Sequence, residues 1–342
     1  MAEAAHTGPK SAGAKMAKAK EPAAVSTRVS PWYLVVLAGS ALAALAAFYL
    51  VLMGLETTNR LPPPAFSNSL CVDEKLEHMR THKPSSPKLL VIGSSVAWRH
   101  FDGASAEKVS PGSAPYNAGF CGLFADQSVY VANWLLDRNP SVKEVLLLAV
   151  PQDFEDCTGH PAAIFDRKDA DEFVYGGASR WRYYLRYFDP ISLVRNAKGI
   201  AAQRSGANDL DPLVFDGYGA GPLDTSVSRD LTYGPVFRQD PACYAAVAAL
   251  SKRLKSEGRR LMIAATPIHP DWKAQYDPQG KMVGAFTSGA KAIPASEFWD
   301  GDKANLFDKS AYTDAVHFRW SAAGKFSQAL ASNFHFGDAP HE

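Results

Sequence analysis

The chain has 342 residues, 46% of them hydrophobic and 21% charged, and its formal net charge is +1. This composition is that of an ordinary globular protein with one or two domains. A charge so close to zero argues against a nucleic-acid-binding protein, which would carry a basic excess.

The first 30 residues hold most of the positive charge. Five basic residues oppose two acidic ones there, a local charge of +3 that leaves −2 for the rest of the chain. The segment is rich in Ala, Gly and Lys and has no periodic apolar residues. We therefore interpret residues 1–30 as a disordered basic head.

An uncharged run of 27 residues follows, from Val29 to Leu55. A bilayer span needs about 20 apolar residues, so residues 31–55 are predicted to form a transmembrane helix. A buried core helix and a cleaved signal peptide are the alternatives. The run is long for the first, and no A-x-A-like cleavage site follows it before Glu56, so an uncleaved signal anchor is favoured.

Lysines precede this run and none follows it closely, which predicts a cytoplasmic N-terminus. The rest of the chain would then lie on the periplasmic side of an inner (cytoplasmic) membrane. Four cysteines, Cys71, Cys121, Cys157 and Cys243, fit an oxidising compartment and match no zinc-ligand spacing. They allow three disulfide pairings.

Residues 56–87 contain LPPP, two further prolines and serine turns, and are interpreted as a stalk with one short helix near 73–80. The globular domain is expected over 88–342. Its predicted strands are 88–93, 113–119, 142–151 and 260–267, and its clearest helices are 125–140, 243–258 and 320–334. Region 152–236 is weakly patterned, with two short helices broken at 189–190, and is treated as an insertion or lid.

Strands that alternate with helices predict an α/β fold whose parallel sheet is covered on both faces. Ligands of such sheets bind at the carboxyl ends of the strands. In this sequence those ends are marked by Gly93, Gly119, Pro151 and Pro267.

The first of these ends reads Gly93-Ser94-Ser95. A serine placed after a buried strand, where a helix begins, can project into a cleft as a nucleophile. Serine is also a common helix N-cap, and from these three residues alone the cap is the more frequent explanation.

Asp314 and His317 stand three residues apart near the C-terminus. A carboxylate so placed can hold the imidazole in the tautomer that accepts a serine proton. The alternative is a solvated turn with an incidental histidine.

The order of these motifs resembles the SGNH (GDSL-like) hydrolase superfamily. The resemblance covers about residues 88–335 and implies a flavodoxin-like three-layer α/β/α fold. It also implies Ser95 as nucleophile, Asp314 and His317 as its base pair, and Gly119 and Gln152 as oxyanion-binding residues. No cofactor or metal is expected.

Two residues depart from the family pattern. Ser94 stands where the family has Asp, which leaves Ser94 as a rival nucleophile beside Ser95. Gln152 stands where the family has Asn. Its amide can still donate a hydrogen bond, but the side chain is one methylene longer.

Four weaker features remain. Trp98 is interpreted as a core residue, and His269 as a loop histidine that could overlook the cleft. The aromatic and basic run 179–187 fits either a sugar-binding groove or an amphipathic helix over the core. Cys121 and Cys157 each follow a proposed oxyanion segment, so a disulfide between them is a hypothesis.

A membrane anchor, an exported domain and a Gly-Ser-Ser block resemble accessory proteins of exopolysaccharide acetylation. This resemblance implies O-acetyl transfer to, or removal from, a cell-surface polysaccharide through an acyl-Ser95 intermediate. For transfer, it implies a multi-spanning acyltransferase as partner. The alternatives are a catalytically degenerate domain that binds polysaccharide or assembles a secretion complex, and a lipid esterase or thioesterase.

Overall fold

The computed structural model describes residues 30–67, 69–83, 85–205, 212–236 and 238–337. The chain divides into two compact units, Met1–Gly54 and Leu55–Glu342. Each unit is considered by itself below.

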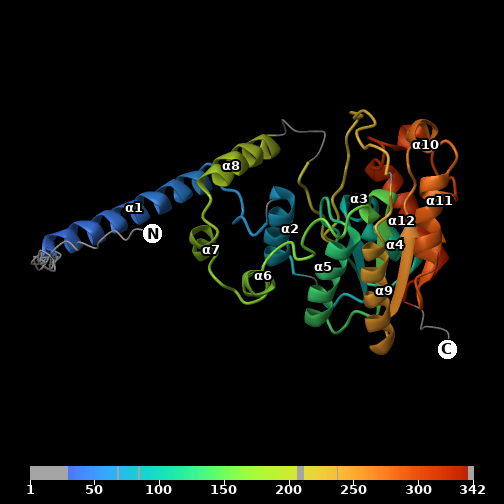
Figure 1. Ribbon diagram of the computed structural model, residues 1–342, viewed down its shortest axis with the longest axis horizontal. Coiled ribbons are helices and arrows are strands. Elements are labelled where there is room, and N and C mark those ends of the chain that lie inside the picture. Colours follow the sequence, from blue (N-terminus) through green and yellow to red (C-terminus); the bar gives the residue numbers. More distant parts are fainter. Residues whose placement is uncertain (1–29, 68, 84, 206–211, 237, 338–342) are drawn as a thin grey trace, which may run out of the picture. The chain divides into compact units, whose positions relative to one another are not determined.

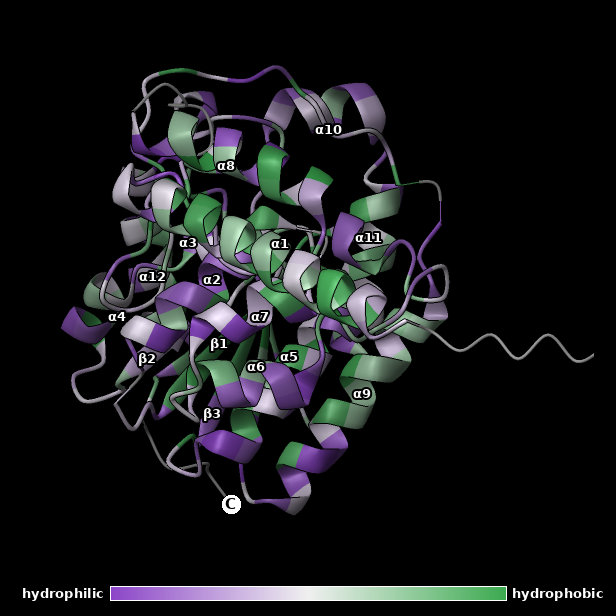
Figure 2. Cartoon of the chain, turned by 90° about the vertical axis from the view of Figure 1, so that its left-hand side faces the viewer, coloured by the Kyte–Doolittle hydropathy of each residue, from purple (hydrophilic) through white to green (hydrophobic). Residues whose placement is uncertain are grey.

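Helix α1 runs from Pro31 to Thr57, close to the predicted 31–55. It is the one helix in the described part of the chain that is long and apolar enough to cross a membrane. Figure 2 colours much of this helix as hydrophobic, and large side chains such as Trp32 and Leu42 are 76% and 67% exposed. An apolar helix with so much exposed surface is unlike the core helix of a soluble domain.

The second unit is built on a parallel sheet of five strands, in the order β2-β1-β3-β4-β5. The strands are β1 (Leu89–Gly93), β2 (Pro115–Asn117), β3 (Glu144–Ala149), β4 (Arg260–Ala265) and β5 (Glu297–Asp300). The first four fall inside the predicted segments. Strand β5 was not expected, because this short edge strand is only partly buried and has no continuous apolar run.

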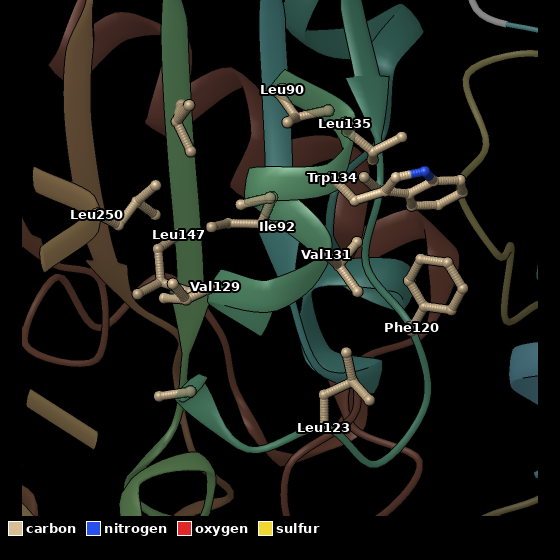
Figure 3. Close-up of a cluster of buried hydrophobic side chains, with 14 of the residues drawn as sticks. Leu90, Ile92, Phe120, Leu123, Val129, Val131, Trp134, Leu135, Leu147 and Leu250 are labelled. Carbon is tan, nitrogen blue, oxygen red and sulfur yellow. The ribbon is translucent and has the colours of Figure 1, made fainter. Parts of the chain in front are cut away.

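Alternate residues of the strands enter two different hydrophobic clusters. Leu90 and Ile92 of β1 belong to a cluster that includes residues of α5 (Ala125–Arg138) and α9 (Pro241–Ser256). Figure 3 shows part of this cluster. Leu89 and Val91 belong to the other cluster, with residues of α12 (Trp320–Phe334). The α/β fold with a parallel sheet is thus confirmed, and its strands are buried as such sheets require.

The remaining helices of the described chain are shown in Figure 1. They are α2 (Leu70–Thr81), α3 (Ser95–His100), α4 (Gly103–Val109), α6 (Arg167–Val174), α7 (Arg180–Arg186), α8 (Pro190–Arg204), α10 (Pro270–Tyr276) and α11 (Lys281–Lys291), with 3₁₀ turns η1 (Pro151–Phe154) and η2 (Lys309–Ala311). The predicted break at 189–190 is confirmed. Asp189 caps α8, and Pro190 occupies its first turn, where a missing N–H costs nothing.

The interpretation of 56–87 as a stalk is corrected by the structure. Leu61 and Phe66 are buried, and Phe66 packs on Phe173 and Tyr183. Lys75 of α2 is also buried, and its ammonium donates to the carbonyl oxygens of Asn117, at 2.7 Å, and Gly219. Proline-rich sequence limits regular structure, but its apolar rings can still pack. Residues 56–87 therefore belong to the folded unit.

The hypothesis of a Cys121–Cys157 disulfide is wrong. Cys71 of α2 pairs with Cys121, and Cys157 pairs with Cys243 in the first turn of α9. The second pairing has a local cause, because the N-cap residue of α9, Asp240, accepts the backbone N–H of Cys157 at 3.0 Å. This contact holds Cys157 beside the helix that carries its partner.

Candidate active site

Ser95 is placed by the end of β1. Gly93 has φ +142°, and a Cβ there would collide with the carbonyl oxygen of Leu148. Only glycine allows β1 and β3 to approach this closely while the chain turns into α3. Ser94 is the N-cap of α3, its hydroxyl accepting the backbone N–H of Val96 at 3.4 Å, and it is 3% exposed. Ser95 is the first residue of the helix, with its hydroxyl directed to the pocket.

The structure brings Ser95, His317 and Asp314 together. His317 Nε2 lies 2.9 Å from Ser95 Oγ, and His317 Nδ1 lies 2.9 Å from Asp314 Oδ2. The ring and the carboxylate are both buried. This is the relative placement of a serine nucleophile, its general base and the carboxylate that orients the base.

Asp314 remains ionised in this arrangement. Burial raises its pKa, but the charge and hydrogen bond of His317, together with the backbone N–H groups of Val316 and His317, outweigh burial and hold the pKa at about 2. An ionised carboxylate can only accept hydrogen bonds, so His317 Nδ1 carries a proton and donates a hydrogen bond to Asp314. Nε2 is then left to accept the proton of Ser95.

Two further residues contact the segment 314–318, and neither belongs to a distinctive sequence motif. His100 Nε2 accepts the backbone N–H of Phe318 at 3.1 Å, and its ring stacks on the Phe318 ring. Burial holds the pKa of His100 well below its ordinary value, so this histidine stays neutral. Arg229 comes from region 152–236 and places its Nε 3.7 Å from Asp314 Oδ2.

A pocket of about 510 Å³ opens over Ser95 and His317. Residues of region 152–236 form part of its wall, including Leu223, Arg229 and Tyr233. The Tyr233 ring lies 5.9 Å from the His317 ring, measured between centroids. The predicted insertion thus contributes directly to the site.

Gly119 has a different role from the expected one. Its N–H donates to Asn117 Oδ1 at 2.9 Å, and Asn117 Nδ2 in turn donates to the carbonyl of Ala97 at 2.8 Å. A Cβ at Gly119 would lie 2.5 Å from the backbone nitrogen of Trp98, so this glycine allows close packing against α3. Gly119 is not among the residues that line the pocket, whereas Gly122, three residues later, is.

Gln152 lies in the pocket wall, as expected. Neither its Oε1 nor its Nε2 has a hydrogen-bond partner among the described residues, although both atoms are buried. An unsatisfied buried amide is costly in a folded protein and is expected to find its partner in a ligand. The next residue, Asp153, accepts the Val150 N–H at 3.0 Å, and burial raises its pKa to about 7.

The weaker sequence features lie as follows. Trp98 is buried and also lines the pocket, so it serves both core and wall. His269 caps α10 by accepting the N–H of Asp271, and it is not a pocket residue. The 179–187 run forms α7, where Tyr183 and Tyr184 are buried away from the pocket wall. Within the described chain, no group of His, Cys, Asp and Glu residues is arranged to hold a metal ion.

Comparison with models of known protein families found no match, and comparison with curated protein sequences found none either.

Proposed function

We propose that this protein is a serine-dependent acyl-transfer enzyme of the SGNH type, acting on O-acetyl groups of an exported cell-surface polysaccharide. The observation that carries the proposal is the 2.9 Å contact between Ser95 Oγ and His317 Nε2, with Asp314 behind the imidazole. Two distant parts of the chain, Ser95 and the Asp314–His317 pair, converge here, and an incidental Asp-x-x-His turn would not require this.

The reaction proceeds in two steps. His317 Nε2 takes the hydroxyl proton of Ser95 while Oγ attacks the acyl carbonyl carbon. The ester C–O bond then breaks, and the leaving alkoxide takes the proton from His317. In the second step, water or a sugar hydroxyl loses its proton to His317 and attacks the acyl carbonyl carbon. The bond to Ser95 Oγ then breaks, and His317 returns the proton to Oγ. Water gives hydrolysis, and a sugar hydroxyl gives transfer.

The tetrahedral intermediate carries a negative oxygen that needs hydrogen-bond donors. The Gln152 amide is the best supported donor, because it is buried in the pocket wall without a partner. The backbone around Gly122 and the N–H of Ser95 complete the candidate set. Gly119 is not part of it, since its N–H is already bonded to Asn117.

Four observations support the remaining parts of the proposal. The two clusters on alternate sides of the sheet support a flavodoxin-like three-layer arrangement. The apolar helix α1 supports anchoring in the inner membrane, and two disulfides support a periplasmic catalytic domain. Phe124 and Tyr233, both half-buried in the pocket wall, offer aromatic surface for sugar rings. For acetyl transfer, a multi-spanning acyltransferase would supply the acyl group.

The second candidate is a degenerate domain that binds polysaccharide without turnover. The observation in its favour is the internal hydrogen bond of Gly119, which removes one expected oxyanion donor. Partial loss of the oxyanion hole slows such enzymes by about 10²–10³-fold per donor.

The test compares the full chain with a Ser95→Ala variant, both in detergent micelles, after brief incubation with p-nitrophenyl acetate. We expect a burst of nitrophenol and an intact-mass increase of about 42 Da, the acetyl group, in the parent chain only. Added oligosaccharides then distinguish transfer from hydrolysis. A folded parent chain that gives neither burst nor adduct would favour the binding role.

A further inference from the structure

The most exposed apolar side chains of the second unit gather on α7, α8 and the turn between them. Leu185, Phe188, Ile191 and Val194 are 51%, 55%, 78% and 57% exposed. All other large apolar side chains described in Leu55–Glu342 are at most 45% exposed. Surface of this kind is unfavourable in water and marks a contact site.

Leu185, Phe188, Ile191 and Val194 are called the apolar row below, and basic residues border it. Arg195 and Lys198 line the same shallow depression as Ile191 and Val194. The one acidic residue within 185–198, Asp189, caps the N-terminus of α8 through the N–H groups of Ile191 and Ser192. Asp169 and Glu172, which lie beside Leu185, are paired with Arg186 and Arg182. Apolar side chains flanked by Arg and Lys are typical of helices that lie in the interface of a lipid bilayer.

The contacts of α7 and α8 with the residues that follow α1 also point to a lipid bilayer. The charge-free stretch of the chain ends at Leu55, and the residues directly after it are held by these two helices. Arg180 pairs with Glu56 at 3.6 Å, and Tyr184 donates to the carbonyl of Pro62 at 2.6 Å. Arg204, at the end of α8, donates to the carbonyl of Asn59 at 2.8 Å.

These contacts fix the depth of α7 and α8 if α1 crosses a bilayer. The hydrocarbon core ends near Leu55, so residues 56–62 lie at the level of the headgroups. Helices bonded to residues 56–62 must lie at that level too. We propose that residues 185–198 form a membrane-contact surface, with the apolar row at the acyl boundary and Arg195 and Lys198 toward lipid phosphates. The inference rests on the membrane anchoring included in the proposed function.

The experiment uses the full chain in vesicles of phosphatidylethanolamine and phosphatidylglycerol. All four native cysteines are paired, so single added cysteines can carry a nitroxide label. The test positions are Ile191→Cys and Val194→Cys, whose exposure leaves the core undisturbed. Val109→Cys on α4, 41% exposed, is the matched apolar control, and Leu42→Cys in α1 marks the bilayer interior. Accessibility to oxygen and to a water-soluble nickel complex is measured at each position.

We expect the oxygen-to-nickel accessibility ratio at 191 and 194 to exceed that at 109 at least about threefold, since oxygen concentrates in lipid and the nickel complex in water. Equal ratios at 191, 194 and 109, with position 42 in lipid, would overturn the inference and leave the anchor intact. Labels at 191 and 194 that both reagents fail to reach would mean a protein partner instead of lipid. A water-exposed label at 42 would overturn the anchor and the inference together.

Discussion

The two sides of the pocket differ in how many of their hydrogen bonds are already made. On the proton-transfer side, Ser95, His317 and Asp314 form a closed chain of contacts between 2.9 and 3.1 Å. Elsewhere in the pocket lining, the amide of Gln152 is buried and has no partner within the described residues. In the proposed reaction, the proton-transfer side is complete before substrate binds, and the Gln152 side gains its partner when the oxyanion forms. Preorganised donors of this kind favour the transition state over the ground state.

Asp314→Asn should give the largest effect, because it disrupts the completed side. The Asn amide would donate to His317 Nδ1, which places the imidazole proton on Nε2 and leaves no acceptor for the Ser95 proton. We expect kcat for p-nitrophenyl acetate to fall by about 10⁴-fold with little change in KM. An unchanged thermal midpoint would show that the fold is intact. A loss below tenfold would mean that Asp314 does not orient the base.

Gln152→Ala should give the next largest effect, because it removes the donor that lacks a partner. We expect kcat to fall by about 10²–10³-fold while the acetyl adduct on Ser95 still forms slowly. Glu155→Gln changes another residue of the same wall and should keep the parental rate. If Gln152→Ala also keeps the parental rate, the Gln152 amide is not an oxyanion donor.

Asp153→Asn tests the electrostatics of the Gln152 side. Burial raises the pKa of Asp153 to about 7 from 3.8, so the unfolded chain loses this proton at lower pH than the folded chain does. Stability is therefore greatest below pH 4, falls by at most about 1.4 kcal/mol per pH unit between pH 4 and 7, and is constant above pH 7 as far as this group is concerned.

The Asn variant should lack that contribution. Its thermal midpoint, compared with that of the parent chain at half-unit steps from pH 4 to 8, should decline less steeply below pH 7. Parallel curves would mean that Asp153 has an ordinary carboxyl pKa.

Ser94→Ala should give the smallest effect on rate and so separates the two adjacent serines. The variant loses the N-cap of α3, which costs about 1 kcal/mol of stability. Its kcat should stay close to that of the parent chain, whereas Ser95→Ala abolishes the burst. A rate loss at Ser94 as large as that at Ser95 would reverse the assignment of the nucleophile.

Much of this arrangement could be predicted from sequence, and the exceptions have physical reasons. Continuous apolar runs closed by Gly or Pro identify strands such as β1 and β3, because their sheet is buried on both faces. Asp314 and His317 are only three residues apart, so the contact between their side chains can be predicted from the sequence. These features depend on neighbouring residues alone.

The failures concern long-range contacts. The resemblance implies Gly119 as an oxyanion donor, and nothing in the sequence shows that Asn117 accepts the Gly119 N–H. The packing of residues 61–66 depends on Phe173 and Tyr183, more than 100 residues away. The disulfide pairing likewise depends on Asp240, which holds Cys157 beside α9.

The disulfide pattern has a consequence for biosynthesis. The cysteines pair in chain order, the first with the second (Cys71 with Cys121) and the third with the fourth (Cys157 with Cys243). If the part of the chain after α1 enters an oxidising compartment in sequence order, the first pair is completely exposed before the third cysteine emerges. Oxidation in order of emergence therefore yields the native bonds directly, and no mispaired intermediate has to be exchanged by thiolate attack. Such a chain should mature with an oxidase alone, without a disulfide isomerase.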